Sequence, residues 1–548
     1  MTQHFDYIVV GAGSSGATLA TRLAQRIDGR VLLLEAGGRR ENDLWIRVPI
    51  GLAKILMNPK YAWHFNTEPQ TSLAGQAVFW PRGRLVGGSG SVNGNVLVHG
   101  DPGEFDRWRE MGNVGWGYED VLPYFKRLES ATIGSDRLRG RDGPISVTAL
   151  AEQPNELSDA FLEACTQAGI PFTPDYNGEH YEGVGYLQLS TRKGRRCSAA
   201  FAYLNGLHPP NLVVEADSTA LRVLLDGRRA IGIEYERGGE VRAVHAGREV
   251  IVCAGPVKSP QLLEMSGIGN GALLQQLGIP VVHHLPGVGE NLVDHVQSRI
   301  NLQCTRPITM NDVAYNPLRQ AAMATKYLMT GRGLFATPGC TVHAMVRSSP
   351  QVARPDIKIQ LWHMSSEARF ETAAPGKKFG LDRFSGFSIG LFQAAPESRG
   401  FVHARSADPR ANPSIDPRYL SSDVDKAAML AAVRISRRVI QQAAIAPYIV
   451  RETQPGIDVN SDEDIMAYLR RSAQSSYHPV GSCKMGNDAT AVVDNSLKVY
   501  GIESLRVADS SIMPTMCSVN TNAASIMVGE KAADHILGFG AATGVRTP

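Results

Sequence analysis

The chain has 548 residues, 43% of them hydrophobic and 20% charged, and its formal net charge is +3. This length exceeds what one hydrophobic core usually supports and predicts two or more domains. The composition is typical of a soluble globular enzyme, not of a disordered or membrane-embedded chain. The nearly balanced charge gives no basis for nucleic-acid binding, and we interpret the cluster RKGRR at 192–196 as a solvated loop.

The cysteines and the N-terminus predict the cellular compartment. Seven widely spaced cysteines stand at 165, 197, 253, 304, 340, 483 and 517, and none forms a CxxC pair. This pattern predicts reduced thiols in a cytoplasmic protein. A strand pattern starts close to residue 5, and no apolar stretch approaches the roughly 20 residues that span a bilayer. We therefore expect neither a signal peptide nor a transmembrane segment. The oligomeric state stays open.

The N-terminal segment YIVVGAGSSGATLATRLAQ predicts a short strand, a glycine turn and a helix. Gly11, Gly13 and Gly16 have GxGxxG spacing. Gly11 permits the tight turn, Gly13 lets a pyrophosphate approach the backbone, and Gly16 lets helix and strand pack closely. A second apolar strand, RVLLLEAG, ends in Glu35, where an acidic residue is expected to bind ribose hydroxyls. Because NAD and FAD share this pattern, these residues leave the cofactor open.

A second glycine cluster, PRGRLVGGSGSVNGNVLVHG at 81–100, lies too far from the first to join the same phosphate loop. Its small residues favour close approach to a flat ring, for which an NAD enzyme has no obvious use. This cluster resembles the first signature of the glucose-methanol-choline (GMC) oxidoreductases, and GPVKSPQLLEMSGIG at 255–269 resembles the second. The C-terminal segments YHPVGSCKMG and SVNTNAASIMVGEKAADHIL follow in the family's order, so the resemblance spans about residues 5–538.

The resemblance implies an α/β fold with a Rossmann-like FAD-binding domain and a discontinuous α+β substrate domain built on an antiparallel sheet. The FAD domain is expected to contain residues 1–150, 196–297 and 468–548, and the substrate domain residues 151–195 and 298–467. The turn-rich stretch 398–417 predicts antiparallel strands. The stretch 317–329 predicts an amphipathic helix packed on the domain, with a membrane-touching or lid helix as the alternative.

The resemblance also implies the FAD contacts: the first glycine turn at the pyrophosphate, the end of the second strand at the ribose, the second glycine cluster along the isoalloxazine ring, and a backbone contact to adenine. The expected residues are Gly11, Gly13, Ser15, Gly16, Glu35, Ala36, Val86, Gly88, Ser89, Asn93, Ala220, Asp509, Asn520 and Thr521. A helix that starts near Asn520 would direct its dipole at the flavin pyrimidine. Val92 stands where some choline-oxidising members carry a histidine bonded to the flavin, which predicts non-covalent FAD.

His478, in the segment HPVGSCKMG, has four interpretations: a turn residue, a metal ligand, a partner of a nucleophilic Cys483, or a proton acceptor. No further ligand stands at metal-binding spacing, and no motif supplies a base and an oxyanion hole for Cys483, so no metal site and no nucleophile are predicted. Alcohol oxidation by hydride transfer to flavin requires a group that accepts the hydroxyl proton. By resemblance, His478 accepts this proton and Asn522 binds the alcohol oxygen.

The expected activity is FAD-dependent oxidation of the CH–OH group of a small or medium alcohol, and the chain most resembles bacterial, choline-dehydrogenase-like members of the family. A quinone-type electron acceptor is favoured over oxygen, and a GMC-fold hydroxynitrile lyase is the alternative from another class. Trp362, His363 and Phe370 are candidate substrate contacts. Because no acidic residue can be assigned to a quaternary ammonium group, we expect an uncharged primary or aromatic alcohol instead of choline.

Overall fold

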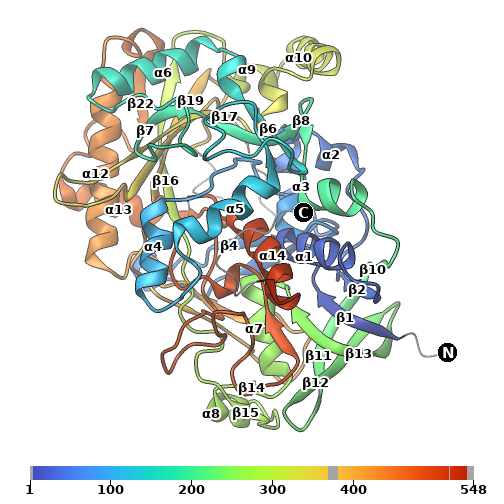
Figure 1. Ribbon diagram of the computed structural model, residues 1–548. Coiled ribbons are helices and arrows are strands. Elements are labelled where there is room, and N and C mark those ends of the chain that lie inside the picture. Colours follow the sequence, from blue (N-terminus) through green and yellow to red (C-terminus); the bar gives the residue numbers. More distant parts are fainter. Residues whose placement is uncertain (1–3, 368–379, 518, 540–548) are drawn as a thin grey trace.

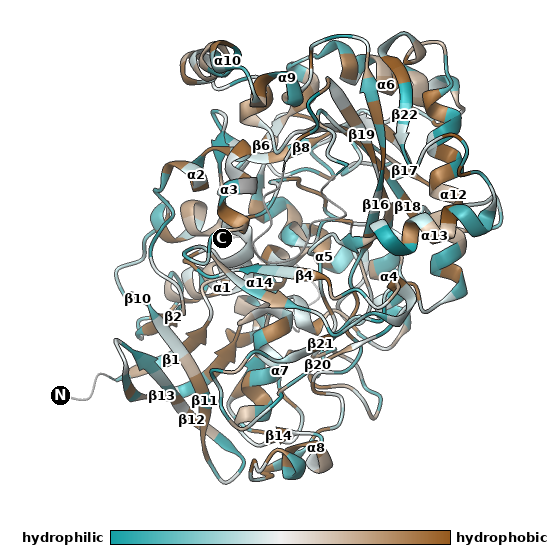
Figure 2. Ribbon diagram, turned by 180° about the vertical axis from the view of Figure 1, so that it is seen from behind, coloured by the Kyte–Doolittle hydropathy of each residue, from teal (hydrophilic) through white to brown (hydrophobic). Residues whose placement is uncertain are grey.

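Two seven-stranded sheets organise the chain (Figure 1). The computed structural model describes residues 4–367, 380–517 and 519–539, so the predicted substrate contact Phe370 lies outside the described residues. Figure 2 shows apolar residues concentrated in the strands of both sheets, with polar residues on the outer helices. Each sheet therefore forms the centre of one hydrophobic core.

The first sheet contains the predicted N-terminal strands, in the order β10-β2-β1-β13-β12-β11, and β24 also pairs with β13. Tyr7 pairs with Val31 and Val10 with Val252, both in parallel register. β2 is buried throughout, as expected for a parallel strand covered on both faces. The strands are β1 (Phe5–Val10), β2 (Val31–Leu34), β10 (Leu212–Glu215), β11 (Ser218–Asp226), β12 (Arg229–Arg237), β13 (Glu240–Val252) and β24 (Leu505–Val507).

Two helices from opposite ends of the chain lie side by side near this sheet (Figure 1). α1 (Ser14–Ala24) contacts β1 and β2, and α14 (Asn522–Ile536) packs between α1 and α5 (Tyr118–Leu128). A Cβ atom at Gly529 would lie only 2.4 Å from the backbone oxygen of Ser15, so this glycine allows the close contact. Asn522 begins α14, which confirms the predicted helix but moves its start two residues beyond Asn520.

The second sheet is antiparallel, in the order β22-β16-β19-β18-β17-β7, and β23 also pairs with β16. α6 (Glu156–Gln167) and α12 (Asp423–Ile440) pack against it, and α13 (Asp462–Ser472) packs on α12. The strands are β7 (Gly183–Tyr186), β16 (Val296–Cys304), β17 (Cys340–Val346), β18 (Ile357–Trp362), β19 (Gly386–Gln393), β22 (Ile449–Gln454) and β23 (Gln474–Ser475). The expected FAD-domain segment 468–548 thus contributes β23 to the substrate-domain sheet, and the domain boundaries stay a prediction.

The remaining elements are shorter or peripheral. β20 and β21 pair in antiparallel fashion, which confirms the strands predicted within 398–417. The elements are α2 (Leu44–Arg47), α3 (Leu52–Leu56), β3 (Ala62–Asn66), β4 (Phe79–Gly83), α4 (Pro102–Glu110), β5 (Glu129–Ser130), β6 (Ile145–Ala149), β8 (Gln188–Arg192), β9 (Arg195–Arg196), α7 (Gly255–Met265), β14 (Ile268–Gly269), α8 (Gly271–Gln276), β15 (His283–His284), α9 (Met310–Ala314), α10 (Pro317–Thr330), β20 (Phe401–His403) and β21 (Ser414–Asp416).

The helix predicted at 317–329 forms as α10, which contacts α9 and packs Tyr327 against Val48 and Ala336 but is otherwise largely exposed. It projects from the edge of the molecule in both views (Figures 1 and 2), and Tyr327 is its one fully buried residue. Leu318 and Met329 are 82% and 80% exposed. Within the described part of the chain, no helix is both long and apolar enough to cross a bilayer.

Candidate active site

A cavity with about 1510 Å³ of space, partly open to solvent, lies beyond the carboxyl ends of β1 and β2. Open α/β sheets bind ligands at this edge. Most predicted site residues line the cavity: Gly11, Gly13, Ser15, Glu35, Ala36, Gly88, Ser89, Asn93, Ala220, His478, Asp509, Asn520, Thr521 and Asn522.

The three glycines of the first turn have the distinct geometries that their spacing predicts. Gly11 has φ +100°, and a Cβ there would lie 2.5 Å from the backbone oxygen of Cys253. A Cβ at Gly16 would lie 2.0 Å from the backbone oxygen of Gly11, so Gly16 permits close packing. A Cβ at Gly13, by contrast, would meet no protein atom within 4 Å. The backbone at Gly13 is thus open to a ligand, as a bound pyrophosphate requires.

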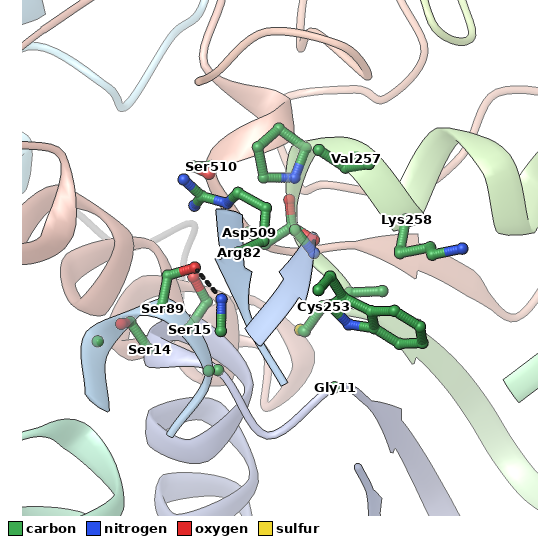
Figure 3. Close-up of a pocket in the computed structure, with 18 of the residues that line it drawn as sticks. Gly11, Ser14, Ser15, Arg82, Ser89, Cys253, Val257, Lys258, Asp509 and Ser510 are labelled. Atoms are coloured by element: carbon green, nitrogen blue, oxygen red, sulfur yellow. Dashed lines mark hydrogen bonds between the residues drawn. The ribbon is translucent and has the colours of Figure 1, made fainter. Parts of the chain in front are cut away.

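The N-termini of α1 and α14 converge on the cavity. The Ser14 hydroxyl donates to Oδ1 of Asn522 over 2.6 Å, and the Ser15 hydroxyl donates to the backbone oxygen of Ser525 over 2.7 Å. Figure 3 shows Ser14, Ser15 and Ser89 gathered on one side of the cavity, and Lys258 of α7 on the other. Two helix N-termini favour negative charge, so the site fits the phosphates and the electron-rich pyrimidine of FAD.

Two buried carboxylates organise the backbone around the cavity. Glu35 accepts hydrogen bonds from the backbone N–H groups of Ala12 and Gly37, at 3.0 and 2.9 Å, and burial raises its pKa to about 7. Asp509 accepts from the Gly255 N–H (2.8 Å) and from the Ser259 hydroxyl (2.6 Å) of α7. Glu35 thus holds the backbone on either side of the first turn, and Asp509 holds the start of α7. The expected contact of Glu35 with the ribose stays a prediction.

Four predicted site residues do not line the cavity. Gly16 serves the helix packing described above, and Val86 is 1% exposed within the core of the first sheet. His363 lies just beyond β18, where Nε2 is 2.8 Å from the Thr341 hydroxyl and 3.2 Å from that of Ser158 on α6. The Trp362 ring is covered by the Arg299 guanidinium, 4.3 Å from its centroid. Val86, Trp362 and His363 therefore lie outside the lining of the cavity, and their expected contacts with FAD or substrate stay predictions.

His478 lies on a tightly held turn at the cavity. Its backbone N–H donates to the buried carboxylate of Asp294 over 2.8 Å, and the Ser475 hydroxyl donates to the same carboxylate over 2.5 Å. The preceding Tyr477 has φ 64°, an uncommon value for a bulky residue, and Nη1 of Arg82 donates to its backbone oxygen over 2.7 Å. Such a conformation persists only where the surroundings impose it, and functional sites often contain one.

The structure corrects the predicted partner of His478. Nδ2 of Asn520 lies 3.1 Å from Nε2 of His478, whereas Asn522 faces Ser14 at the start of α1. Asn520 precedes α14 and Asn522 is its first residue, so the two amides point to different parts of the cavity. The side-chain pair at the cavity is therefore His478 and Asn520, not His478 and Asn522.

A chain of hydrogen bonds determines which nitrogen of His478 carries the proton. His295 Nε2 is 3.0 Å from the backbone oxygen of Ala394, which can only accept, so Nε2 of His295 is the protonated nitrogen. Burial lowers the pKa of His295 to about 4, so its Nδ1 is an acceptor. His478 Nδ1 lies 3.1 Å from that acceptor and must donate. Nε2 of His478 consequently presents a lone pair beside Asn520.

The electrostatic surroundings keep His478 neutral. Burial, followed by His295, Lys358 and Arg82, holds the pKa of His478 well below its usual value. A neutral imidazole is the form that can accept a proton. Cys483 is buried, and burial raises the pKa of its thiol well above the usual value, which agrees with the rejection of a nucleophilic cysteine.

Sequence reasoning missed four residues that support His478: Arg82, Asp294, His295 and Lys358. Asp294 and His295 stand together just before β16, in the segment NLVDHVQ. An acid next to a histidine directly before a strand is a combination that could have drawn attention. Lys358 is the one charged residue within the otherwise uncharged β18, which offered a second signal.

Comparison with known proteins identifies the family. The family description GMC oxidoreductase matches residues 5–297 with its N-terminal part and residues 396–529 with its C-terminal part. The chain is a GMC oxidoreductase. As a GMC oxidoreductase it is an FAD-dependent enzyme that acts on alcohols, which confirms the resemblance and the enzyme class predicted from the glycine clusters.

Curated relatives of this GMC oxidoreductase match almost the whole chain. Human mitochondrial choline dehydrogenase is 42% identical over 543 residues, which cover 97% of this chain and 90% of the human protein. The oxygen-dependent choline dehydrogenase of Photobacterium profundum is 41% identical and covers 98% of this chain and 94% of its own. The high coverage shows that the similarity includes both sheets.

Solved structures confirm the fold class of the GMC oxidoreductase. Pyridoxine 4-oxidase from Mesorbium loti superimposes with a TM-score of 0.87 at 29% identity, over 98% of this chain and 99% of that one. A fungal aryl-alcohol oxidase superimposes with a TM-score of 0.84 at 25% identity, over 98% and 99%. The fold is thus a Rossmann-like FAD-binding part joined to a substrate part with an antiparallel sheet, as predicted.

Proposed function

We propose that this GMC oxidoreductase oxidises the CH–OH group of an uncharged primary or aromatic alcohol, with His478 as the proton acceptor and Asn520 as the group that binds the alcohol oxygen. The observation that carries the proposal is the unprotonated Nε2 of His478, which lies beside the Asn520 amide in the cavity. A bound FAD would supply the hydride acceptor for the alcohol carbon, and the residues that would hold it include Gly11, Gly13 and Glu35. We favour a quinone-type electron acceptor over oxygen.

The proposed mechanism assigns a separate task to each side chain. Nε2 of His478 accepts the hydroxyl proton as the C–H bond breaks, which removes the cost of forming a free alkoxide. Nδ2 of Asn520 donates a hydrogen bond to the same oxygen and fixes the orientation of the alcohol. Asp294 holds the backbone of His478, and His295 holds its ring, so the lone pair points in one direction.

The charge around His478 supports an alcohol without a positive group. Arg82 and Lys358 are the two cations that depress the pKa of His478. Asp294 is a carboxylate that interacts with Arg82, and its oxygens already accept hydrogen bonds from Tyr419, Ser475 and the backbone of His478. A quaternary ammonium group would add a third cation. The proposed substrate class therefore differs from the choline named for the relatives.

Anaerobic mixing with a panel of alcohols tests the proposed function. We expect primary or aromatic alcohols to bleach the flavin absorbance near its visible maximum without oxygen, and added quinone to restore the colour faster than air does. A hydroxynitrile lyase would leave the flavin oxidised throughout. If no alcohol in the panel bleached the flavin, the result would contradict the proposal.

We expect FAD to be bound without a covalent link. Val92, at the position that the resemblance assigns to a flavin-bonded histidine, is 3% exposed and packs with Ile46, Ile55 and Leu85. An alkyl side chain cannot form a bond to the flavin ring. Acid precipitation should therefore release all yellow colour into the supernatant, whereas flavin in the washed protein pellet would show a covalent link.

A further inference from the structure

We infer that Lys358 positions Asn520 for the reaction and excludes cationic alcohols from the site. The inference rests on the proposed function, because it assigns Lys358 to the pair that is proposed to bind and deprotonate the alcohol. It goes beyond that function by naming a residue that determines both the orientation of the amide and the charge that the substrate can carry.

Lys358 stands on β18 of the antiparallel sheet, and it reaches the catalytic pair from the substrate side of the molecule. Its side chain is 1% exposed, and Nζ donates to Oδ1 of Asn520 over 3.0 Å. An ammonium group can only donate, so it fixes which end of the Asn520 amide faces it. Nδ2 of Asn520 is thereby directed at Nε2 of His478, 3.1 Å away.

The hydrogen-bond chain consequently has a donor-only group at one end and an acceptor-only group at the other. The ammonium of Lys358 begins it, and the backbone oxygen of Ala394 ends it, after Asn520, His478 and His295. Every amide orientation and tautomer between these ends is determined. Nε2 of His478 and the ammonium of Lys358 thus hold the two ends of the Asn520 amide, and loss of the ammonium would remove one of these two contacts and loosen the N–H group that is proposed to bind the alcohol oxygen.

The positive charge of Lys358 has no carboxylate partner among residues 4–367, 380–517 and 519–539. Its other close neighbour is the ring of Phe392, whose centroid is 5.0 Å from Nζ. The charge of Lys358 also acts to lower the pKa values of Cys340 and His343 on β17, and neither residue is an anion that would balance it. Burial lowers the pKa of Lys358 to about 8, so it remains mostly protonated at neutral pH.

The uncompensated charge of Lys358 lies next to Asn520, which is proposed to bind the alcohol. It therefore opposes binding of a cationic alcohol strongly, because charges in a poorly solvated site are weakly screened. Choline and 3,3-dimethylbutan-1-ol have nearly the same shape and differ in the replacement of a positive nitrogen by carbon. We expect flavin reduction in the wild-type holoenzyme to be at least about tenfold more efficient with the neutral alcohol, measured as the reduction rate constant divided by the apparent Kd.

The variant Lys358→Met keeps the length of the side chain but removes its charge and its donors. We expect it to lower reduction by 3,3-dimethylbutan-1-ol and to shift the efficiency ratio toward choline by at least about tenfold. Lys358→Arg retains a charge and donors, and it should preserve the wild-type ratio. A wild-type preference for choline, or an unchanged ratio in Lys358→Met, would overturn the inference.

A second measurement does not depend on turnover. In holoenzyme with ¹⁵N-labelled histidine, NMR titration reports the pKa and the tautomer of His478, with His478→Gln for assignment. His295, Arg82 and Lys358 lower the pKa of His478, and Asp294 is the carboxylate that faces its backbone. Loss of the Lys358 charge should therefore raise the pKa of His478, and the low-pH limit of flavin reduction should move to higher pH.

The two measurements separate the inference from the proposed function. If neither alcohol bleaches the flavin but the pKa of His478 rises in Lys358→Met and not in Lys358→Arg, the positioning role stands while the proposed substrate class fails. If the pKa and tautomer of His478 are the same in all three proteins, Lys358 does not act on the catalytic pair, whatever the alcohol.

Discussion

Replacing His478 with alanine is expected to slow flavin reduction by alcohol by about 100- to 10,000-fold, the usual effect of removing a positioned base. FAD should remain bound, because the turn at Gly11, Gly13 and Glu35 that would hold it does not include His478. Stopped-flow reduction of the FAD-loaded variant measures the effect, and the loss should fall on the reductive half-reaction.

The control for this variant is His363→Ala, which removes the other histidine that the sequence had suggested for the site. His363 faces Thr341 and Ser158 outside the cavity, so per molecule of bound FAD its loss should leave the reduction rate unchanged. If His478→Ala reduces its flavin as fast as His363→Ala does, His478 is a structural turn residue and not the proton acceptor.

The two asparagines Asn520 and Asn522 should have clearly different effects. Asn520→Ala is expected to slow flavin reduction by about 100-fold, the size typical for loss of one hydrogen-bond donor at a reacting oxygen. Asn522→Ala should instead weaken retention of FAD, because Asn522 links the N-termini of α1 and α14. Stopped-flow reduction measures the first effect, and the fraction of flavin lost on gel filtration measures the second.

These variants form a matched pair, since each removes the same side chain from positions two residues apart. A reversed result, with slow reduction in Asn522→Ala alone, would restore the partner that the sequence had suggested. Because His478 and Asn520 act on one hydroxyl group, the double variant should lose less than the product of the two single effects.

Much of the fold could be predicted because local patterns determine it. The glycine spacing, the apolar strands and Glu35 define the first βαβ unit without reference to the rest of the chain. Gly11 and Gly16 have the steric reasons that their positions predict, and Gly13 lies at the cavity, where its expected contact with a pyrophosphate stays a prediction. The resemblance of the second glycine cluster then indicated FAD.

The arrangement around His478 could not be predicted, because it depends on contacts between remote segments. His295 and His478 are separated by 183 positions in the chain, and Lys358 and Asn520 by 162. Which asparagine faces His478 depends on where α14 begins. Because the helix starts at Asn522 and not at Asn520, Asn520 lies before the helix beside His478, whereas Asn522 faces Ser14. Alternation along β18 likewise could not show that His363 would face α6.

The route of the hydrogen-bond chain through both sheets has a consequence for protein engineering. Asn520 precedes α14 beside the first sheet, whereas Lys358 on β18 and Ala394 after β19 belong to the second sheet. Grafting the substrate part of another family member onto this scaffold would thus replace Lys358 and Ala394, the two ends of the hydrogen-bond chain that orients His478. Such chimeras should bind flavin normally yet lose turnover unless the donor supplies an equivalent cation and carbonyl. Libraries that vary specificity should therefore hold these two positions constant and diversify the rest of the pocket.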